Sequence, residues 1–316
     1  MDVVSEALAA VRLGTPRATW IERSGRWAVR LAAYDGVGFH AVLRGSCRVA
    51  LDGAEPVELG PGDVVLVPHG SAHVLADHGA DRAAMARAVP FTGSPVPTGP
   101  GAPPLVRDPG ATELLCGKYR LDRARVHPFL VGLPELVHLP AERVAAHPQL
   151  GLAMGLLRAE IEDRRPGAQA ALTGLLDLLL VYLLRARPVA EAPTGGWDAA
   201  LADPVVSVAL RVLHADPAAS WTAESLARAA GVSRATLTRR FTAGVGRPPM
   251  AYLTWWRLTS GALRLRTSTE PLAAVARAVG YGGPYAFSHA FTREFGVTPG
   301  RYRARAAAAG GEDLAA

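Results

Sequence analysis

The N-terminal part of the chain alternates short apolar runs with turn signals. Runs rich in apolar and β-branched residues cover 27–31, 39–43, 47–51, 56–59 and 63–67. The turns between them are Asp35-Gly36, Asp52-Gly53 and Gly60-Pro61-Gly62. Such runs predict strands, and several strands at close spacing favour a barrel or a jelly roll. Another strand is expected over 112–119, and the Gly- and Pro-rich residues 92–109 are expected to form a loop.

Helical spacing replaces this pattern after about Pro134. Apolar residues recur three and four positions apart in 150–161 and, more densely, in 172–184, which predicts two amphipathic helices in an antiparallel pair. Such leucine-rich helices need a partner, either the strands or a second protomer, and we expect self-association through the pair. The most apolar stretch, 171–184, contains Asp177 and is too short to span a bilayer.

The remaining segments have a composition typical of connectors and tails. Residues 188–203, rich in Pro, Ala and Gly, are expected to form a linker, and 306–316 a disordered tail. The first ten residues lack the cationic start and apolar run of a signal peptide, so a cytoplasmic protein is expected. Two cysteines exclude a disulfide-dense scaffold and a four-cysteine zinc site.

The last third of the chain contains an internal repeat. Each copy contains a helical pattern, a glycine and a second helical pattern, which predicts two helix-turn-helix units. Four positions recur 49 residues later, and five recur 50 residues later: Ala227, Arg228, Ala229 and Gly231 as Ala276, Arg277, Ala278 and Gly280, then Phe241, Thr242, Gly246, Pro249 and Tyr252 as Phe291, Thr292, Gly296, Pro299 and Tyr302.

The positive charge of the chain is concentrated on this repeat. Residues 220–305 hold thirteen arginines and three acidic residues, whereas the whole chain has a formal net charge of +6. Localised positive charge is typical of proteins that bind polyanions. The alternative is a solvated surface in an arginine-rich protein, because Lys118 is the only lysine.

The second helix of each copy offers an outward face that can read base edges. Ser233 is the expected N-cap of the first reading helix, with Leu237 and Phe241 facing inward. Gly283-Pro284 begins the second, with Phe287 and Phe291 inward. The expected base contacts are Ala235, Thr238, Arg239, Tyr285, Ser288 and His289, and the expected backbone contacts are Ser233, Arg240, Thr242, Arg293, Arg301 and Arg303. Some of these arginines have the alternative role of stabilising helix C-termini.

Residues 250–266 are expected to connect the two units as a helix that holds them in register. Reading helices about 34 Å apart would fit one turn of B-DNA.

Two stretches of this segment, SLARAAGVSRATLTRRF and AVARAVGYGGPYAFSHAFTREFGVTPGRYR, resemble the DNA-binding domain of the AraC/XylS transcription regulators. This resemblance covers about a quarter of the chain, residues 221–302. The family usually has a serine or aspartate pair where this chain has Gly282-Gly283-Pro284, and Ala235 is small where many relatives carry a larger contact residue. These departures imply a second reading helix without the family's usual cap residues and fewer base contacts from the first.

The N-terminal part resembles the cupin-type sensor of one branch of these regulators. GPGDVVLVPHGSAH matches the second cupin motif at Pro68, Gly70 and His73, and FHAVLRGSCRVALDG matches the first in part, with His40 but without the paired histidines and glutamate of metal-binding cupins. The resemblance implies an α+β multidomain protein: a cupin-like β-barrel (1–135), a helical pair (136–187), a linker (188–203), a double helix-turn-helix domain (204–305) and a tail (306–316).

His40 and His73 are the candidate effector-binding residues, because both are expected to face the barrel interior. They can hold a polar effector or a metal, with His69 as a third ligand, or else bond structural groups. Cys47 and Cys116 are candidate redox residues if their thiol pKa values are low, and buried inert thiols otherwise.

These features favour a sequence-specific transcription regulator that is not an enzyme, needs no cofactor and responds to a small-molecule or redox/metal signal. Its expected partners are promoter DNA, a second copy of the chain, the effector and, for an activator, RNA polymerase. A cupin enzyme with a DNA-binding appendage is the first alternative, and the incomplete metal motif weighs against it. A nucleoid-type protein without sequence preference is the second alternative.

Overall fold

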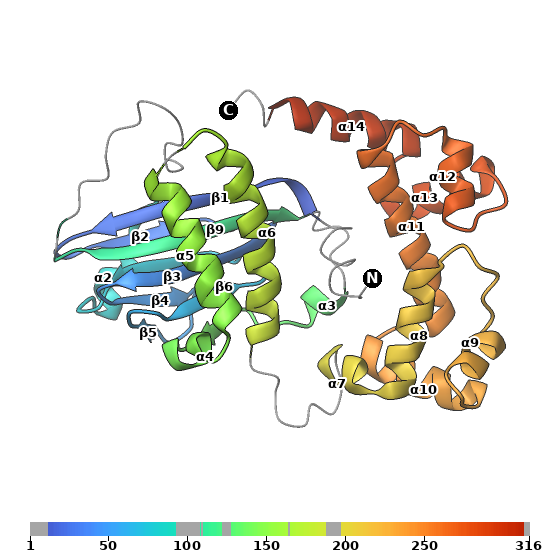
Figure 1. Cartoon of the computed structure of the whole chain (residues 1–316), viewed down its shortest axis with the longest axis horizontal. Helices are drawn as coiled ribbons and strands as arrows, with labels where there is room; N and C mark the ends of the chain where they lie inside the picture. The colour runs from blue at the N-terminus through green and yellow to red at the C-terminus, as the bar shows by residue number, and fades with distance from the viewer. Residues whose placement is uncertain are drawn as a thin grey trace. The chain divides into compact units, whose positions relative to one another are not determined.

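The computed structural model describes residues 12–92, 108, 110–121, 128–163, 165–187 and 197–312 (Figure 1). The chain divides into two compact units. One contains the described residues of 15–121 and 133–187, and the other contains residues 12–14, 128–132 and 197–312.

The N-terminal unit is built on two five-stranded sheets. The first has the order β1-β9-β3-β6-β10 and the second β5-β4-β7-β2-β8. The pairings among β2 to β10 are antiparallel except for β2 with β8, which is parallel. The strands are β1 Arg12–Arg23, β2 Ala28–Leu31, β3 Gly36–Arg44, β4 Cys47–Leu51, β5 Val57–Leu59, β6 Val64–Val67, β7 His73–Asp77, β8 Val89–Pro90, β9 Thr112–Leu121 and β10 Val137–Leu139.

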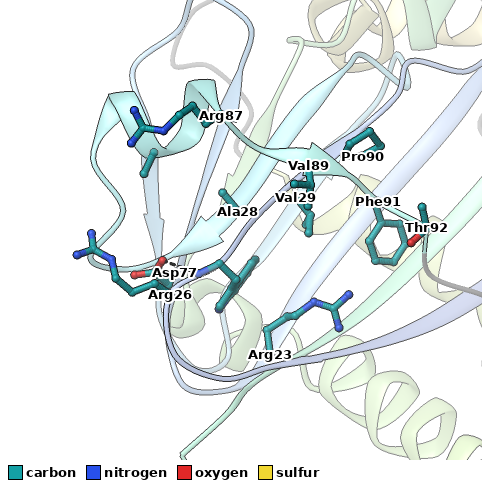
Figure 2. Close-up of a pocket in the computed structure, with 12 residues that line it drawn as sticks. Arg23, Arg26, Ala28, Val29, Asp77, Arg87, Val89, Pro90, Phe91 and Thr92 are labelled. Carbon is teal, nitrogen blue, oxygen red and sulfur yellow. Dashed lines mark hydrogen bonds between the residues drawn. The ribbon is translucent and has the colours of Figure 1, made fainter.

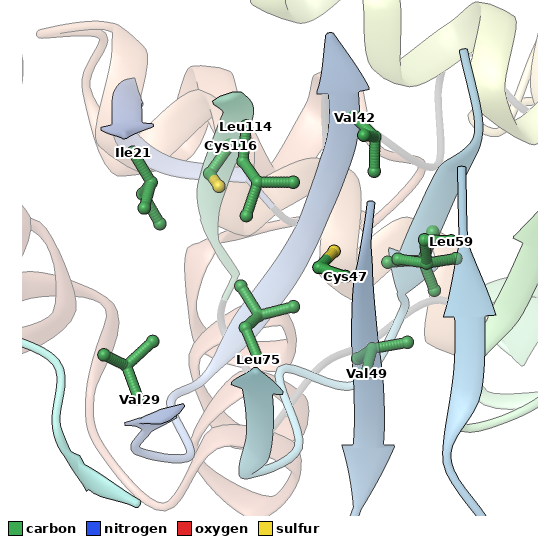
Figure 3. Packing of buried hydrophobic residues seen from close by; sticks show 10 residues of the cluster. Ile21, Val29, Val42, Cys47, Val49, Leu59, Leu75, Leu114 and Cys116 are labelled. Carbon is green, nitrogen blue, oxygen red and sulfur yellow. The ribbon is translucent and has the colours of Figure 1, made fainter. Parts of the chain in front are cut away.

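The predicted β-rich N-terminal fold is confirmed, with two sheets in place of one closed barrel. Both sheets supply the core between them, for example Ile21 of β1 and Leu114 of β9 from one, Val49 of β4 and Leu75 of β7 from the other (Figure 3). The apolar runs in the sequence did not indicate β1, β7, β8 or β10. Residues 93–107 and 109 of the predicted loop lie outside the described residues.

Helices follow and interrupt these strands: α2 Arg82–Ala86, α3 Pro128–Val131, α4 Ala141–Ala145, α5 Pro148–Asp163 and α6 Ala168–Ala186. The predicted antiparallel pair corresponds to α5 and α6, which pack side by side (Figure 1). The Tyr119 hydroxyl of β9 donates a hydrogen bond to the Leu176 carbonyl of α6, so β9 lies against α6.

The α6 helix corrects the expectation drawn from residues 171–184. It has 19 residues and a mean hydropathy of 1.4, so by length and composition it can cross a membrane. Six of its leucines are buried, and four of them, Leu172, Leu176, Leu179 and Leu183, repeat every three or four positions, which is the spacing of a core-facing helix stripe. Packing against α5 and β9 accounts for this apolar stripe.

The C-terminal unit contains the two predicted helix-turn-helix units. Its helices are α7 Trp197–Ala202, α8 Pro204–Ala215, α9 Ala223–Ala229, α10 Arg234–Val245, α11 Pro249–Thr267, α12 Leu272–Ala278, α13 Pro284–Phe295 and α14 Pro299–Glu312. Gly231 and Gly280 make the two turns with φ of +69° and +83°, a region that glycine enters without steric cost. The α7 helix lies inside the predicted linker, and α14 extends to Glu312 into the predicted tail.

Candidate nucleic-acid interface and effector pocket

The first candidate reading surface is the outward face of α10. The Ser233 hydroxyl accepts a hydrogen bond from the Thr236 amide and so satisfies one of the donors left free at a helix N-terminus. Leu237 and Phe241 are 0% exposed and anchor the inner side. Ala235 and Arg239 are exposed and Thr238 is half-buried. The structure thus brings these three predicted base contacts to one face, where the contacts themselves stay predictions.

Two predicted backbone contacts of α10 have other surroundings in this structure. Arg240 Nε lies 2.7 Å from Asp203 Oδ2, while Oδ1 of the same carboxylate caps α8. Arg240 therefore ties α10 to the start of α8, and a phosphate would have to compete with Asp203. The Thr242 hydroxyl is buried without a hydrogen-bond partner among the described residues. This corrects its expected outward orientation, because Thr242 follows the core residue Phe241 and lies on its shielded flank.

The second candidate reading surface is the outward face of α13. Gly283 precedes the helix without a side-chain cap, and Pro284 takes its first position. Phe287 and Phe291 are 0% exposed, whereas Tyr285 is 89% exposed. His289 is exposed and Ser288 is half-buried on the same side. The predicted base contacts of the second unit thus also share one face.

The predicted phosphate contacts near α13 differ in their surroundings. Arg293 and Arg301 are exposed. Arg303 is half-buried and donates a hydrogen bond of 2.6 Å to the Glu270 carbonyl. Arg303 therefore stabilises the connection between α11 and α12, so Arg293 and Arg301 are the better placed candidates for contact with a phosphate.

Arg257 of α11 joins the two helix-turn-helix units, a role that the sequence did not reveal. Its Nε donates to the Pro217 carbonyl at 2.6 Å and its Nη2 to the Ala219 carbonyl at 2.8 Å, both in the loop between α8 and α9 of the first unit. A Cβ at Gly280, the turn of the second unit, would lie 3.0 Å from Arg257 Cζ and 2.9 Å from Ala218 Cα. The guanidinium thus lies where the loop of one unit meets the turn of the other.

The N-terminal unit contains a pocket of about 370 Å³ with His40 and His73 in its wall. Both histidines are buried, with 3% and 2% exposure, as expected for interior-facing residues. The pocket wall is completed by residues of several strands and of the segment after β2: Arg17, Thr19, Ile21, Leu31, Ala32, Ala33, Tyr34, Gly38, Phe91, Cys116, Gly117 and Lys118.

The two histidines and Cys116 form a chain of hydrogen bonds whose proton positions follow from its end. His73 Nδ1 lies 2.7 Å from the Ser71 carbonyl, which can only accept, so Nδ1 carries the proton and Nε2 does not. His40 Nε2, 2.7 Å from His73 Nε2, must then donate. This leaves His40 Nδ1 to accept from the Cys116 thiol, whose sulfur is 2.8 Å away.

Burial keeps every member of this chain neutral. It lowers the pKa of His40 well below its ordinary value, with the charge of His73 as a second cause. It also lowers the pKa of His73 against the opposing hydrogen bond to Ser71. Burial raises the pKa of the Cys116 thiol, and it raises that of Cys47 to about 12. Because the thiolate is the reactive form, these surroundings weigh against a redox role for either cysteine.

A metal finds no complete ligand set in the described part of the chain. No group of three or more His, Cys, Asp and Glu residues there is arranged to hold one. Nε2 of His40 and Nε2 of His73 are already hydrogen-bonded to each other. His69, the expected third ligand, has its Nε2 2.8 Å from the Leu133 carbonyl oxygen. This ring nitrogen is therefore hydrogen-bonded to the backbone and does not complete a metal site.

A second hollow of the N-terminal unit carries three arginines at its edge. Arg23, Arg26 and Arg87 line this hollow together with Val29 and Phe91 (Figure 2). Its volume is about 480 Å³. Two of these arginines donate to nearby carbonyls, Arg26 to Gly79 and Arg23 to Glu22. The hollow combines residues distant in the sequence, and no local motif signalled it.

Comparison with known proteins agrees with both halves of this picture. Residues 2–187 match the family described as Cupin, and 226–305 the family described as a helix-turn-helix domain. A putative AraC-like transcription regulator of Streptomyces lividans is 36% identical over 312 residues, which are 96% of this chain and 98% of the relative. A protein of the same description from Streptomyces antibioticus is 35% identical over 309 residues, with 96% and 98% covered. The DNA-binding domain of the global transcriptional factor AdpA, solved with a target DNA, is 32% identical and covers 33% of this chain and 92% of that one, with a TM-score of 0.31.

Proposed function

Because the chain belongs to the AraC-like transcription regulators that join a cupin domain to a helix-turn-helix domain, we propose that it binds promoter DNA sequence-specifically and that a small molecule in the N-terminal unit controls this binding. The observation that carries the proposal is the paired outward faces of α10 and α13, each anchored by two fully buried side chains. Helices of this kind enter the major groove in helix-turn-helix proteins.

Specificity comes from the exposed side chains of the two faces. Arg239 can pair bidentately with a guanine, and Tyr285 and His289 reach the bases or the backbone of the next groove segment. Arg293 and Arg301 contact phosphates and fix the register without reading sequence. Arg257 holds the two units together, so the faces act on one duplex.

Binding to a duplex from the chain's own genomic sites tests this proposal. At physiological salt and with random duplex in excess, the affinity for the specific duplex should exceed the affinity for random duplex by about 10³-fold or more. Equal competition by random duplex would identify a nucleoid-type protein and overturn the proposal.

Self-association through α5 and α6 is part of the proposed function. Leu152 and Leu156 lie one turn apart on α5 with 68% and 57% exposure, and Leu178 of α6 is 41% exposed. A second copy of the chain would cover these leucines. Leu152→Glu with Leu156→Glu should give a monomer in sedimentation while Gln149→Glu, an exposed change on the same helix, leaves a dimer. A wild-type protein that sediments as a monomer would contradict the proposed self-association through α5 and α6.

The signal is a small molecule in preference to oxidation or a metal. The raised thiol pKa values and the internally bonded histidines support this choice. A ligand controls DNA binding only if its affinity differs between two arrangements of the protein. A regulator of this kind acts in the cytoplasm, and as an activator it also contacts RNA polymerase.

A further inference from the structure

We infer that the pocket beside His40 and His73 binds a small organic anion, a carboxylate with an apolar body. This inference rests on the proposed sensing function and adds the chemical class of the ligand. Three features carry it: the charge of the pocket rim, the placement of Tyr34, and the state of the histidines at the inner wall.

The rim is positively charged. Arg17 of β1 and Lys118 of β9 lie on neighbouring strands and line the pocket, and no Asp or Glu belongs to its described lining. Burial and the charges of Arg120 and Arg17 lower the pKa of Lys118, so its ammonium stands among like charges. A bound carboxylate would relieve this repulsion and accept charge-assisted hydrogen bonds.

Two glycines place Tyr34 beside these cations. A Cβ at Gly36 would lie 2.5 Å from a ring carbon of Tyr34, and one at Gly38 would lie 2.5 Å from its hydroxyl oxygen. The absence of both Cβ atoms lets the ring lie close to β3. Lys118 Nζ is 3.9 Å from the ring centroid, which is a cation–π contact. The ring therefore helps to hold the ammonium at the rim.

The Tyr34 hydroxyl is a third donor for the anion. Burial raises its pKa, so it keeps its proton. No hydrogen bond links this hydroxyl to another of the residues described in the structure. A carboxylate at the rim thus meets two cations and a hydroxyl that remains available to donate.

The inner wall suits an apolar body and not a second charge. The ring nitrogens of His40 and His73 are bonded within the protein and both rings are neutral. Ile21, Leu31 and Phe91 supply apolar surface. The volume of about 370 Å³ is near the lower end of ligand pockets, so the ligand is small, with its carboxylate at the rim and its body inside.

The test compares carboxylates with their neutral amides on the full chain. Hexanoate and hexanamide, and 3-phenylpropionate and 3-phenylpropanamide, are titrated by calorimetry. We expect the affinity of each carboxylate to exceed that of its amide by about fivefold or more, which is the size expected for partly exposed charge contacts. Lys118→Met should abolish this preference and Lys118→Arg should retain it.

Two further variants locate the site. Arg143→Met removes an exposed charge of α4 that neither lines the pocket nor is among the charges that act on Lys118, and it should leave the preference unchanged. Ala33→Trp places a large ring in the pocket and should block binding of all four compounds. Retained binding in Ala33→Trp, or a loss in Arg143→Met equal to that in Lys118→Met, would overturn the inference by showing diffuse attraction to the surface.

The same preparations separate this inference from the proposed function. If neither carboxylate binds at millimolar concentration, or if amides bind equally well, the anion inference fails while specific binding to operator DNA remains a separate result. If the carboxylates bind in the expected pattern but do not change operator affinity, the ligand class stands and the proposed sensing role fails.

Discussion

The two helix-turn-helix units share their inward positions and differ at their outward ones. Leu237 and Phe241 of α10 correspond to Phe287 and Phe291 of α13, and all four are 0% exposed. Outward, Ala235 corresponds to Tyr285 and Arg239 to His289. The two units thus share large buried apolar side chains at these core positions and differ in the residues available to DNA, so they are expected to read different bases.

The starts of the two reading helices differ as well. Ser233 caps α10 with its hydroxyl, whereas Gly283, the residue before α13, provides no side-chain cap. A missing cap leaves helix donors to water, and proline at the first position compensates by lacking one donor. The N-terminus of α10 is therefore stabilised by a side-chain hydrogen bond, whereas that of α13 is stabilised by the backbone conformation of proline.

The largest expected effect tests the shared interior. Phe241→Ala and Phe291→Ala should each lower the free energy of unfolding by about 3–5 kcal/mol, because both rings are fully buried. Urea titration of the full chain, with hydrogen exchange to assign the loss to one unit, measures this. Losses that differ by more than about 2 kcal/mol would break the equivalence of the two cores.

The next effect tests the outward faces. Arg239→Ala should weaken binding to specific duplex by about 1–3 kcal/mol and relax one base position. His289→Ala should relax a different position within the other half of the site. Fluorescence anisotropy with single-base variants of the duplex measures both. If Arg239→Ala lowers the affinity for specific and random DNA equally, Arg239 contacts only phosphates.

A smaller effect tests the coupling of the units through Arg257. Arg257→Met removes two hydrogen bonds to carbonyls and should weaken specific binding by about 1–2 kcal/mol, within the range for charged hydrogen bonds at a partly exposed site. Arg264→Met, an exposed change on the same helix, is the control. Unchanged affinity in Arg257→Met would show that the units keep their register without it.

The smallest effect tests the helix starts. Ser233→Ala should cost about 1 kcal/mol of unfolding free energy through loss of the cap, whereas Gly283→Ser should gain a few tenths of a kcal/mol. The φ of Gly283 is −179°, so serine fits there without strain. Thermal unfolding of the two variants measures the difference. A gain from Ser233→Ala would contradict the assigned cap.

The sequence predicted the parts of the molecule that depend on local spacing. The repeat and its glycine turns indicated both helix-turn-helix units, and the spacing of leucines indicated α5 and α6. Thr242 was placed wrongly because helical angle alone does not show how far a neighbouring core residue shields a flank. The extent of α14 was underestimated because an alanine-rich end has no periodic apolar face.

The pocket depends on contacts that no local pattern encodes. Arg17, Tyr34 and Lys118 are far apart in the sequence and meet because β1 pairs with β9 and because Gly36 and Gly38 admit the tyrosine ring. His40 and His73 were predicted to face the interior, and they do. Their bonds to each other and to Cys116 followed only from the register of β3 with β9 and from the turn before β7.

Selection of bound sequences from a pool of random duplexes is the most direct test of the central claim, that α10 and α13 read one duplex together. We expect two clusters of required base pairs with centres about 10–10.5 base pairs apart. The clusters should differ in sequence, and Arg239→Ala should weaken the requirement for one cluster while His289→Ala weakens it for the other. A single cluster, or two clusters that respond equally to both variants, would contradict it.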